Sequence, residues 1–142
     1  MTSENPAPLI EFTHRPDLDI LVSRWGHQPE PHELPVVYQE MTDVALHERA
    51  RFWLQDIRRR TLNDRQTTLW LLNVYFPDMA SRLGGRLFVA YLLSPALHEA
   101  IISQPNYISA EAYDDKPYAI SFFRDEGAAI KWLQIQQTNK VG

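Results

Sequence analysis

The fold is decided by residues 51–60, which read RFWLQDIRRR. The centre of this stretch is almost continuously apolar, which predicts a β-strand covered on both faces, as the strands of parallel sheets are. The strand runs from Arg51 to Ile57, with Asp56 near its end, and opens into three arginines in a polar loop before the next helix. Because ligands and partners of open α/β sheets dock at the carboxyl ends of strands, this loop is the first candidate site.

Two strands and a helix are predicted on the N-terminal side of that strand. Residues 9–25 indicate a β-hairpin, because Arg15-Pro16-Asp17 supplies turn chemistry between two extended runs. The prolines of residues 26–31 then end the second strand. From Leu34 onward the apolar residues take helical spacing, with Pro35 in the first turn, where its missing N–H is harmless. The apolar stripe of this helix consists of Val37, Met41, Val44 and Ala45.

The segment of residues 67–76 is ambiguous between helix and strand. Its threonines and aromatic residues favour a strand, and residues 69–72 show no polar face. Asn63 or Asp64 is suited to cap a helix, and Pro77 is expected to kink or end one. We predict a helix, because a crossover is needed before the next strand, and expect Gly84-Gly85 to close it.

The C-terminal half continues the alternation of strands and helices. We predict strands at residues 86–93 and 118–123, and a weak strand at residues 107–113. Ser94 and Asp125 are suited to cap the helices that follow the two stronger strands. The order β-β-α-β-α-β-α-β-α predicts a single α/β domain, with a mixed sheet that has an antiparallel hairpin at its edge and right-handed parallel crossovers. We place the domain at residues 9–138, between tails at residues 1–8 and 139–142.

Composition narrows the class of protein. The chain has 142 residues, 44% of them hydrophobic, which is enough for one core. The absence of cysteine excludes disulfides and thiolate chemistry, and the net charge of −4 argues against nucleic acid as a partner. The start of the chain has neither the charge nor the apolar run of a signal peptide, and no apolar stretch reaches the length of a membrane span. We expect a cytoplasmic domain.

Four short strings carry a resemblance to a known family. They are WLQDIR at residues 53–58, WLLNVYFP at residues 70–77, AYLLSP at residues 90–95, and FRDE at residues 123–126 leading to Trp132-Leu133. Together with the predicted order of elements, they resemble the STAS domains of bacterial anti-sigma-factor antagonists, and more closely a broad group of uncharacterised STAS-like bacterial domains. The resemblance implies a regulatory, non-enzymatic role.

The resemblance also implies a switch, from which this chain departs. In the antagonists a serine at the head of the next helix is phosphorylated and controls partner binding, and Asp56 matches the aspartate of that motif. The serine position falls near Arg58, which a serine kinase cannot phosphorylate. Thr61 carries the only hydroxyl in the immediate loop and is the alternative candidate for phosphorylation, whereas its ordinary role would be that of a turn or capping residue.

The basic loop gives the first expected contact surface. Residues 49–65 hold six arginines against two acids, and guanidinium groups near a helix N-terminus suit phosphate, carboxylate or an acidic partner surface. A solvated loop would explain the same charge run. The residues assigned to this partner- or anion-binding surface are Asp56, Arg58, Arg59, Arg60, Thr61, Asn63 and Asp64.

The apolar helix predicted at residues 67–76 gives the second expected contact surface. Trp70, Tyr75 and Phe76 lie on a helix that is apolar on all sides and must bury more than one face, so we predict an apolar interface there, with self-association as one outcome. Packing against Phe88 and Tyr91 in a thick core is the alternative.

Catalysis and metal binding are not expected. The His-Glu pairs at His32, His47 and His98 lack the second histidine of a zinc site, and no acid, base and nucleophile are spaced as a catalytic set. We therefore predict a non-enzymatic regulatory module that binds a protein partner, without cofactor or metal. The alternative is a domain that binds a small-molecule or lipid-like ligand beneath the Trp70 helix, since the STAS fold also resembles lipid-transfer domains.

Overall fold

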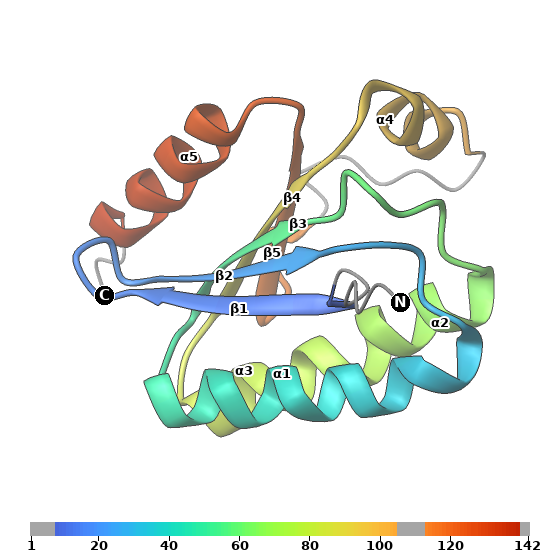
Figure 1. Cartoon of the computed structure of the whole chain (residues 1–142). Coiled ribbons are helices and arrows are strands. Elements are labelled where there is room, and N and C mark those ends of the chain that lie inside the picture. Colours follow the sequence, from blue (N-terminus) through green and yellow to red (C-terminus); the bar gives the residue numbers. More distant parts are fainter. Residues whose placement is uncertain (1–7, 105–112, 140–142) are drawn as a thin grey trace, which may run out of the picture.

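The strands follow one another across the sheet in the same order as along the chain. The computed structural model describes residues 8–104 and 113–139, and five strands of these residues form one mixed sheet, β1-β2-β3-β4-β5 (Figure 1). The strands are β1 (Ile10–Arg15), β2 (Ile20–Trp25), β3 (Phe52–Asp56), β4 (Leu87–Leu92) and β5 (Tyr118–Phe123). β1 pairs with β2 in antiparallel fashion and every later pair is parallel, which confirms the predicted α/β fold with a hairpin at its edge.

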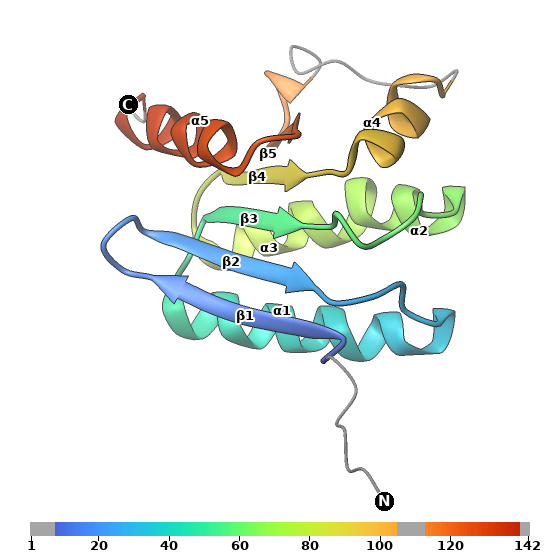
Figure 2. The same ribbon diagram turned by 45° about the horizontal axis from the view of Figure 1, so that its top comes forward.

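Helices cover both faces of the sheet. They are η1 (Pro31–Glu33), α1 (Leu34–Glu48), α2 (Arg65–Trp70), η2 (Leu71–Tyr75), α3 (Phe76–Leu83), α4 (Pro95–Ile102) and α5 (Glu126–Thr138). α1 and the continuous α2–η2–α3 lie against one face, and α5 lies against the other (Figure 1). α4 lies beyond the carboxyl end of β4 (Figure 2). No helix of the described residues is long and apolar enough to cross a membrane.

The central strand β3 is buried on both faces, as its apolar sequence predicts. Trp53 is fully buried and packs into the core beneath α1 and α3, where its indole N–H donates to the carbonyl of Ala50 at 2.8 Å. Phe52 and Leu54 point to the opposite face, where they pack into the core beneath α5. The same alternation sends Gln55 toward α1 and Asp56 toward α5, so neighbouring polar residues enter different environments.

Residues 67–76 are helical, which confirms the predicted crossover. Asp64 caps α2, with its carboxylate accepting the N–H of Thr67 at 2.6 Å. The sequence led us to expect that Pro77 would kink or end the helix, but the helix does not end there and continues to Leu83. A π-helical turn, η2, precedes the proline, and Pro77 falls in the first turn of α3, where a missing N–H is tolerated. The carbonyl of Leu72 in this turn accepts the Tyr118 hydroxyl at 2.8 Å.

The predicted helix boundaries are also confirmed in the C-terminal half. The Ser94 hydroxyl caps α4 by accepting the backbone N–H of Leu97 at 3.1 Å. The Asp125 carboxylate caps α5 by accepting the backbone N–H of Ala128 at 2.8 Å. Gly84 ends α3 with φ of 78°, a left-handed conformation that glycine adopts without strain. The weak strand expected at residues 107–113 falls, apart from Tyr113, outside the described residues, as does most of both predicted tails.

Candidate functional site

The three arginines of the loop after β3 lie in three different environments. Arg58 folds back onto Asp56, Arg59 is exposed to solvent, and Arg60 is buried with 6% of its surface exposed. The sequence predicted that the three arginines lie in a polar loop, and for Arg60, which is buried, a solvent-exposed position is wrong. The loop does lie at the carboxyl end of β3, as predicted, but it divides its charges between the two sides of the sheet.

Asp56 belongs to a saturated ion cluster on the α5 side. Its carboxylate accepts two bonds from the Arg58 guanidinium at 2.9 and 2.8 Å, one from the Arg58 backbone N–H at 3.2 Å and one from Arg24 at 2.9 Å. Arg24 also binds Glu126, at 2.8 and 3.1 Å. This cluster ties the carboxyl ends of β2 and β3 to the first turn of α5, and its acceptors are fully used.

The pKa of the Asp56 carboxyl shows how strongly the cluster holds its charge. Burial by itself would raise that pKa, but the hydrogen bonds from Arg58 and Arg24 outweigh burial and hold the pKa below its ordinary value. The hydrogen bonds from Arg24 likewise lower the pKa of Glu126. Because each carboxylate already has its arginine, the cluster has a structural role and offers no free charge to a ligand.

Arg60 is the opposite case, a buried guanidinium without an acid. Its Nη2 donates to the Asn63 side-chain carbonyl at 2.6 Å, and its guanidinium carbon lies 4.3 Å from the centre of the Trp25 ring. Its Nε is buried and has no hydrogen-bond partner, and no carboxylate of the described residues lies within ion-pair distance of it.

This arrangement of Arg60 has an energetic cost that the fold does not offset fully. Moving a charged group out of water costs several kcal/mol even after relaxation, which is why buried charges are normally paired. Stacking on Trp25 returns about 2 kcal/mol at a desolvated site, and the hydrogen bond from the charged guanidinium to Asn63 returns about 1.5–3 kcal/mol, but neither supplies the opposite charge that a buried ion normally has. A buried anion close to Arg60 would complete the site electrostatically.

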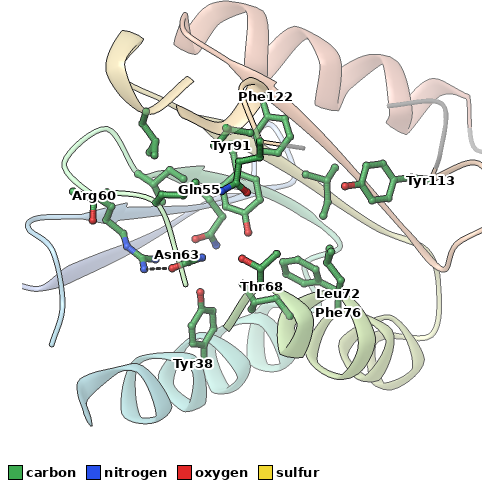
Figure 3. A pocket seen from close by; sticks show the side chains of 18 residues that line it. Tyr38, Gln55, Arg60, Asn63, Thr68, Leu72, Phe76, Tyr91, Tyr113 and Phe122 are labelled. Atoms are coloured by element: carbon green, nitrogen blue, oxygen red, sulfur yellow. Dashed lines mark hydrogen bonds between the residues drawn. The ribbon is translucent and has the colours of Figure 1, made fainter. Parts of the chain in front are cut away.

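A cavity of about 140 Å³ opens beside Arg60, at the carboxyl ends of β3, β4 and β5. Figure 3 shows Arg60 and Asn63 on one side of this space, Leu72 and Phe76 on another, and the Tyr38 ring reaching toward it from α1. Its lining residues are Tyr38, Gln55, Ile57, Arg60, Thr61, Leu62, Asn63, Thr68, Leu71, Leu72, Phe76, Tyr91, Leu97, Ile101, Gln104, Tyr113, Ile120 and Phe122. The space is therefore polar near Arg60 and apolar over most of the remaining wall.

A larger and more open groove of about 650 Å³ lies on the other side of Arg60. It runs between the start of α1 and α2, with prolines of residues 29–35 on one wall and Trp70 on the other. Arg60 and Asn63 line both spaces, so they form part of the wall between them. Both spaces lie beside the Trp70 helix, beneath which the sequence predicts a bound ligand, and that ligand stays a prediction.

Two tyrosines of the cavity keep their protons. Burial raises the pKa of Tyr38, although the neighbouring Arg60 lowers it in part, and burial raises the pKa of Tyr91 well above the ordinary value. The Tyr91 ring stacks on Phe122 with ring centres 5.7 Å apart, which fixes that wall of the cavity. Both hydroxyls stay neutral near physiological pH, so neither adds a negative charge that would repel an anion.

The other residues of the predicted contact surface have local roles. Asp64 is the cap of α2, Asn63 binds Arg60, and the exposed Thr61 uses its backbone N–H to bind the Gln28 side chain at 2.8 Å. Thr61 is therefore not the cap of the helix, which begins four residues later.

The predicted apolar interface is wrong for two of its three residues. Tyr75 and Phe76 are buried, and the Tyr75 hydroxyl lies within hydrogen-bond distance of Thr42 and of the Tyr38 carbonyl. Only Trp70 is exposed, to 40%. Their burial follows from the position of α2–η2–α3, which lies against both the sheet and α1 and so covers two faces of the apolar helix.

Several residues of the cavity were missed in the sequence. Tyr91 and Phe122 lie on the same face of the sheet as Gln55, which the alternation of β3, β4 and β5 could have shown once the strand order was assumed. Tyr38 shares the buried stripe of α1 with Met41 and Ala45, so its role in the cavity had no separate signal.

Comparison with known proteins adds no assignment. No family model matches the chain, and no curated protein matches it significantly. The STAS resemblance thus stays a prediction made from the short strings that carry it. The described residues also hold no group of three or more side chains that could ligate a metal ion.

Proposed function

We propose that this protein is a non-catalytic binding domain that holds a small anionic ligand on Arg60, in the cavity at the carboxyl ends of β3–β5. The observation that carries this proposal is the buried guanidinium whose Nε has no partner and which no carboxylate of the described residues neutralises. The cavity beside it supplies the space, and the tyrosine and threonine hydroxyls in its wall supply further hydrogen-bond donors.

The location supports a binding role. Loops at the carboxyl ends of parallel strands carry the sites of open α/β sheets, and three such strands meet at this cavity. Pockets for small molecules are mostly apolar with a few convergent polar groups, which is the composition of this wall. The π-helical turn η2 adds Leu71 and Leu72 to it, and such turns are frequent at functional sites.

The test is a pair of matched substitutions in the same loop. Replacing Arg60 with glutamine removes the buried charge, whereas Arg59→Gln removes an exposed charge one residue away. We expect native mass spectrometry of the wild-type protein, with small organic anions added at millimolar concentration, to show a bound anion, Arg60→Gln to lose it, and Arg59→Gln to retain it. Equal retention by both variants would contradict the proposal, as would a bound molecule without an acidic group.

We also propose a second function, contact with a protein surface through the outer side of α2 and η2. Leu69, Trp70 and Val74 are exposed there to 42, 40 and 53%, and neighbouring exposed apolar side chains are typical of interfaces. The STAS resemblance supports the same role, since those domains regulate through protein contacts. Self-association is the form of this contact that can be tested with the protein alone.

Introducing charge on that surface is expected to prevent self-association. We expect the wild-type protein to show a concentration-dependent increase in molar mass by sedimentation equilibrium, and Leu69→Glu/Val74→Glu to remain monomeric. Ile135→Glu on α5 changes a residue exposed to a similar degree, 44%, on the opposite face and should behave as the wild type. A monomeric wild-type protein at every concentration would exclude the self-associating form of this function.

A further inference from the structure

We propose that the ligand of the Arg60 cavity is a monocarboxylate whose apolar body has the size of one aromatic ring or a chain of about six carbon atoms. This inference deepens the proposed function and rests on it. It assigns the acid group to the Arg60 end of the cavity and the apolar body to the wall formed by Leu72, Phe76 and Phe122.

The single positive charge of the site favours a ligand with one negative charge. Arg60 is the one charged side chain among the described residues that line the cavity. A phosphate group carries about −1.5 to −2 at neutral pH, so it would leave surplus negative charge beside a single cation. Asp64, at the edge of the adjoining groove, adds a further negative charge on that side. A carboxylate balances Arg60 one to one.

The donors near Arg60 suit the geometry of a carboxylate. The Arg60 side chain lines the cavity, and guanidinium groups bind carboxylates through parallel hydrogen bonds. The Tyr38 hydroxyl interacts with the Arg60 side chain, and Thr68 lines the same part of the cavity. Figure 3 shows the hydroxyls of Tyr38 and Thr68 facing the space next to Arg60 and Asn63. A carboxylate oxygen placed there would have donors on more than one side.

The volume limits the apolar body. The cavity measures about 140 Å³. An engineered protein cavity of about 150 Å³ lined by apolar side chains holds one benzene molecule, so a ring or short chain of that size fills this space. The stacked pair of Tyr91 and Phe122 offers a flat wall that suits an aromatic ring. Longer chains exceed the cavity, so the part of the chain beyond it would stay in contact with water.

The inference can be tested with defined probes on the full-length protein. Benzoate and hexanoate are the probes, with dissociation constants of about 0.1–1 mM expected for molecules of this size. Inorganic phosphate tests the charge, benzyl alcohol replaces the acid group of benzoate with a neutral one, and dodecanoate tests the length. Binding is measured by isothermal titration calorimetry and by the change in tryptophan fluorescence, to which Trp70 and Trp25 near Arg60 should contribute.

We expect benzoate and hexanoate to bind the wild-type protein and Arg59→Gln equally, and to bind Arg60→Gln at least about tenfold more weakly, the loss of one charge-assisted contact. Benzyl alcohol, phosphate and dodecanoate should bind more weakly than benzoate to the wild-type protein. If phosphate binds more tightly than benzoate and its binding depends on Arg60, the assignment of a carboxylate is wrong but the proposed anion site stands. If dodecanoate binds more tightly than hexanoate, the proposed size of the apolar body is wrong. If no anion binds in a manner that depends on Arg60, the proposed function fails as well.

Discussion

Replacement of Arg60 by methionine is expected to make the ligand-free protein more stable by about 1–2 kcal/mol, and to abolish stabilisation by ligand. Methionine fills the volume of the arginine stem without the desolvation cost of a buried charge. Replacing a whole buried ion pair with apolar side chains is often neutral or stabilising by about 1–4 kcal/mol, and Arg60 has no acid to leave unpaired. The lost stacking on Trp25 and the lost bond to Asn63 reduce the gain, which places it at the low end of that range. Urea unfolding curves of both proteins, with and without benzoate, measure the two effects.

Arg58→Met is the control, because it removes an arginine from the same loop that already has its acid. That variant leaves the buried Asp56 carboxylate with fewer donors and should lose stability. A gain in stability for Arg60→Met and a loss for Arg58→Met would show that Arg58 stabilises the fold, whereas Arg60 does not. A loss of more than about 1 kcal/mol in Arg60→Met would contradict our interpretation, because it would make the stacked arginine a stabilising part of the fold.

The signals that predicted the fold are local. The apolar run of residues 52–57, the turn of the hairpin and the caps Asp64, Ser94 and Asp125 each act within a few residues, so they can be identified in the sequence. The choice of a helix for residues 67–76 did not come from periodicity. It came from the need to connect two parallel strands, and the position of α2–η2–α3 between β3 and β4 confirms it.

The signals that decide the site are long-range. Three consecutive arginines in a loop ordinarily indicate solvent exposure, and Arg60 is buried because Trp25, thirty-five positions earlier in the chain, offers its ring as a support. Tyr75 and Phe76 were expected at an interface because their helix is apolar all round, and α1 and the sheet together cover them. Neither packing partner can be read from the residues adjacent in sequence, so the sequence placed the basic loop at the carboxyl end of β3 but did not show which of its arginines is buried.

Replacement of Asp56 by alanine is expected to destabilise the protein by about 2–3 kcal/mol. The carboxylate accepts three side-chain bonds from Arg58 and Arg24 and one backbone bond, and hydrogen bonds to charged groups contribute about 1.5–3 kcal/mol each when they are buried. The side chains of Arg58 and Arg24 are 50 and 43% exposed, so solvent screening reduces the summed contribution of these hydrogen bonds. Water can also hydrate both arginines in the variant. Chemical denaturation at neutral pH measures the loss.

Asp17→Ala provides a closely matched control. Asp17 and Arg15 form the same two-bond pair at the same sequence spacing, with distances of 3.1 and 2.8 Å, but both side chains are exposed. Its removal should leave the free energy of unfolding close to that of the wild type, because water replaces an exposed ion pair almost completely. Equal losses in the two variants would show that burial of Asp56 adds nothing to the strength of its pair.

The pH dependence gives a second test of the same cluster. Because the folded-state pKa of Asp56 lies below its ordinary value of 3.8, the stability that it contributes is fully present above that value and is lost as the pH falls through the folded pKa. The difference in stability between the wild type and Asp56→Ala should therefore be constant from about pH 5 to 8, where carboxylates are ionised, and should shrink below about pH 4. A difference that persisted unchanged at the lowest pH at which the protein stays folded would mean that the aspartate acts through packing, and that its charge does not join β2, β3 and α5.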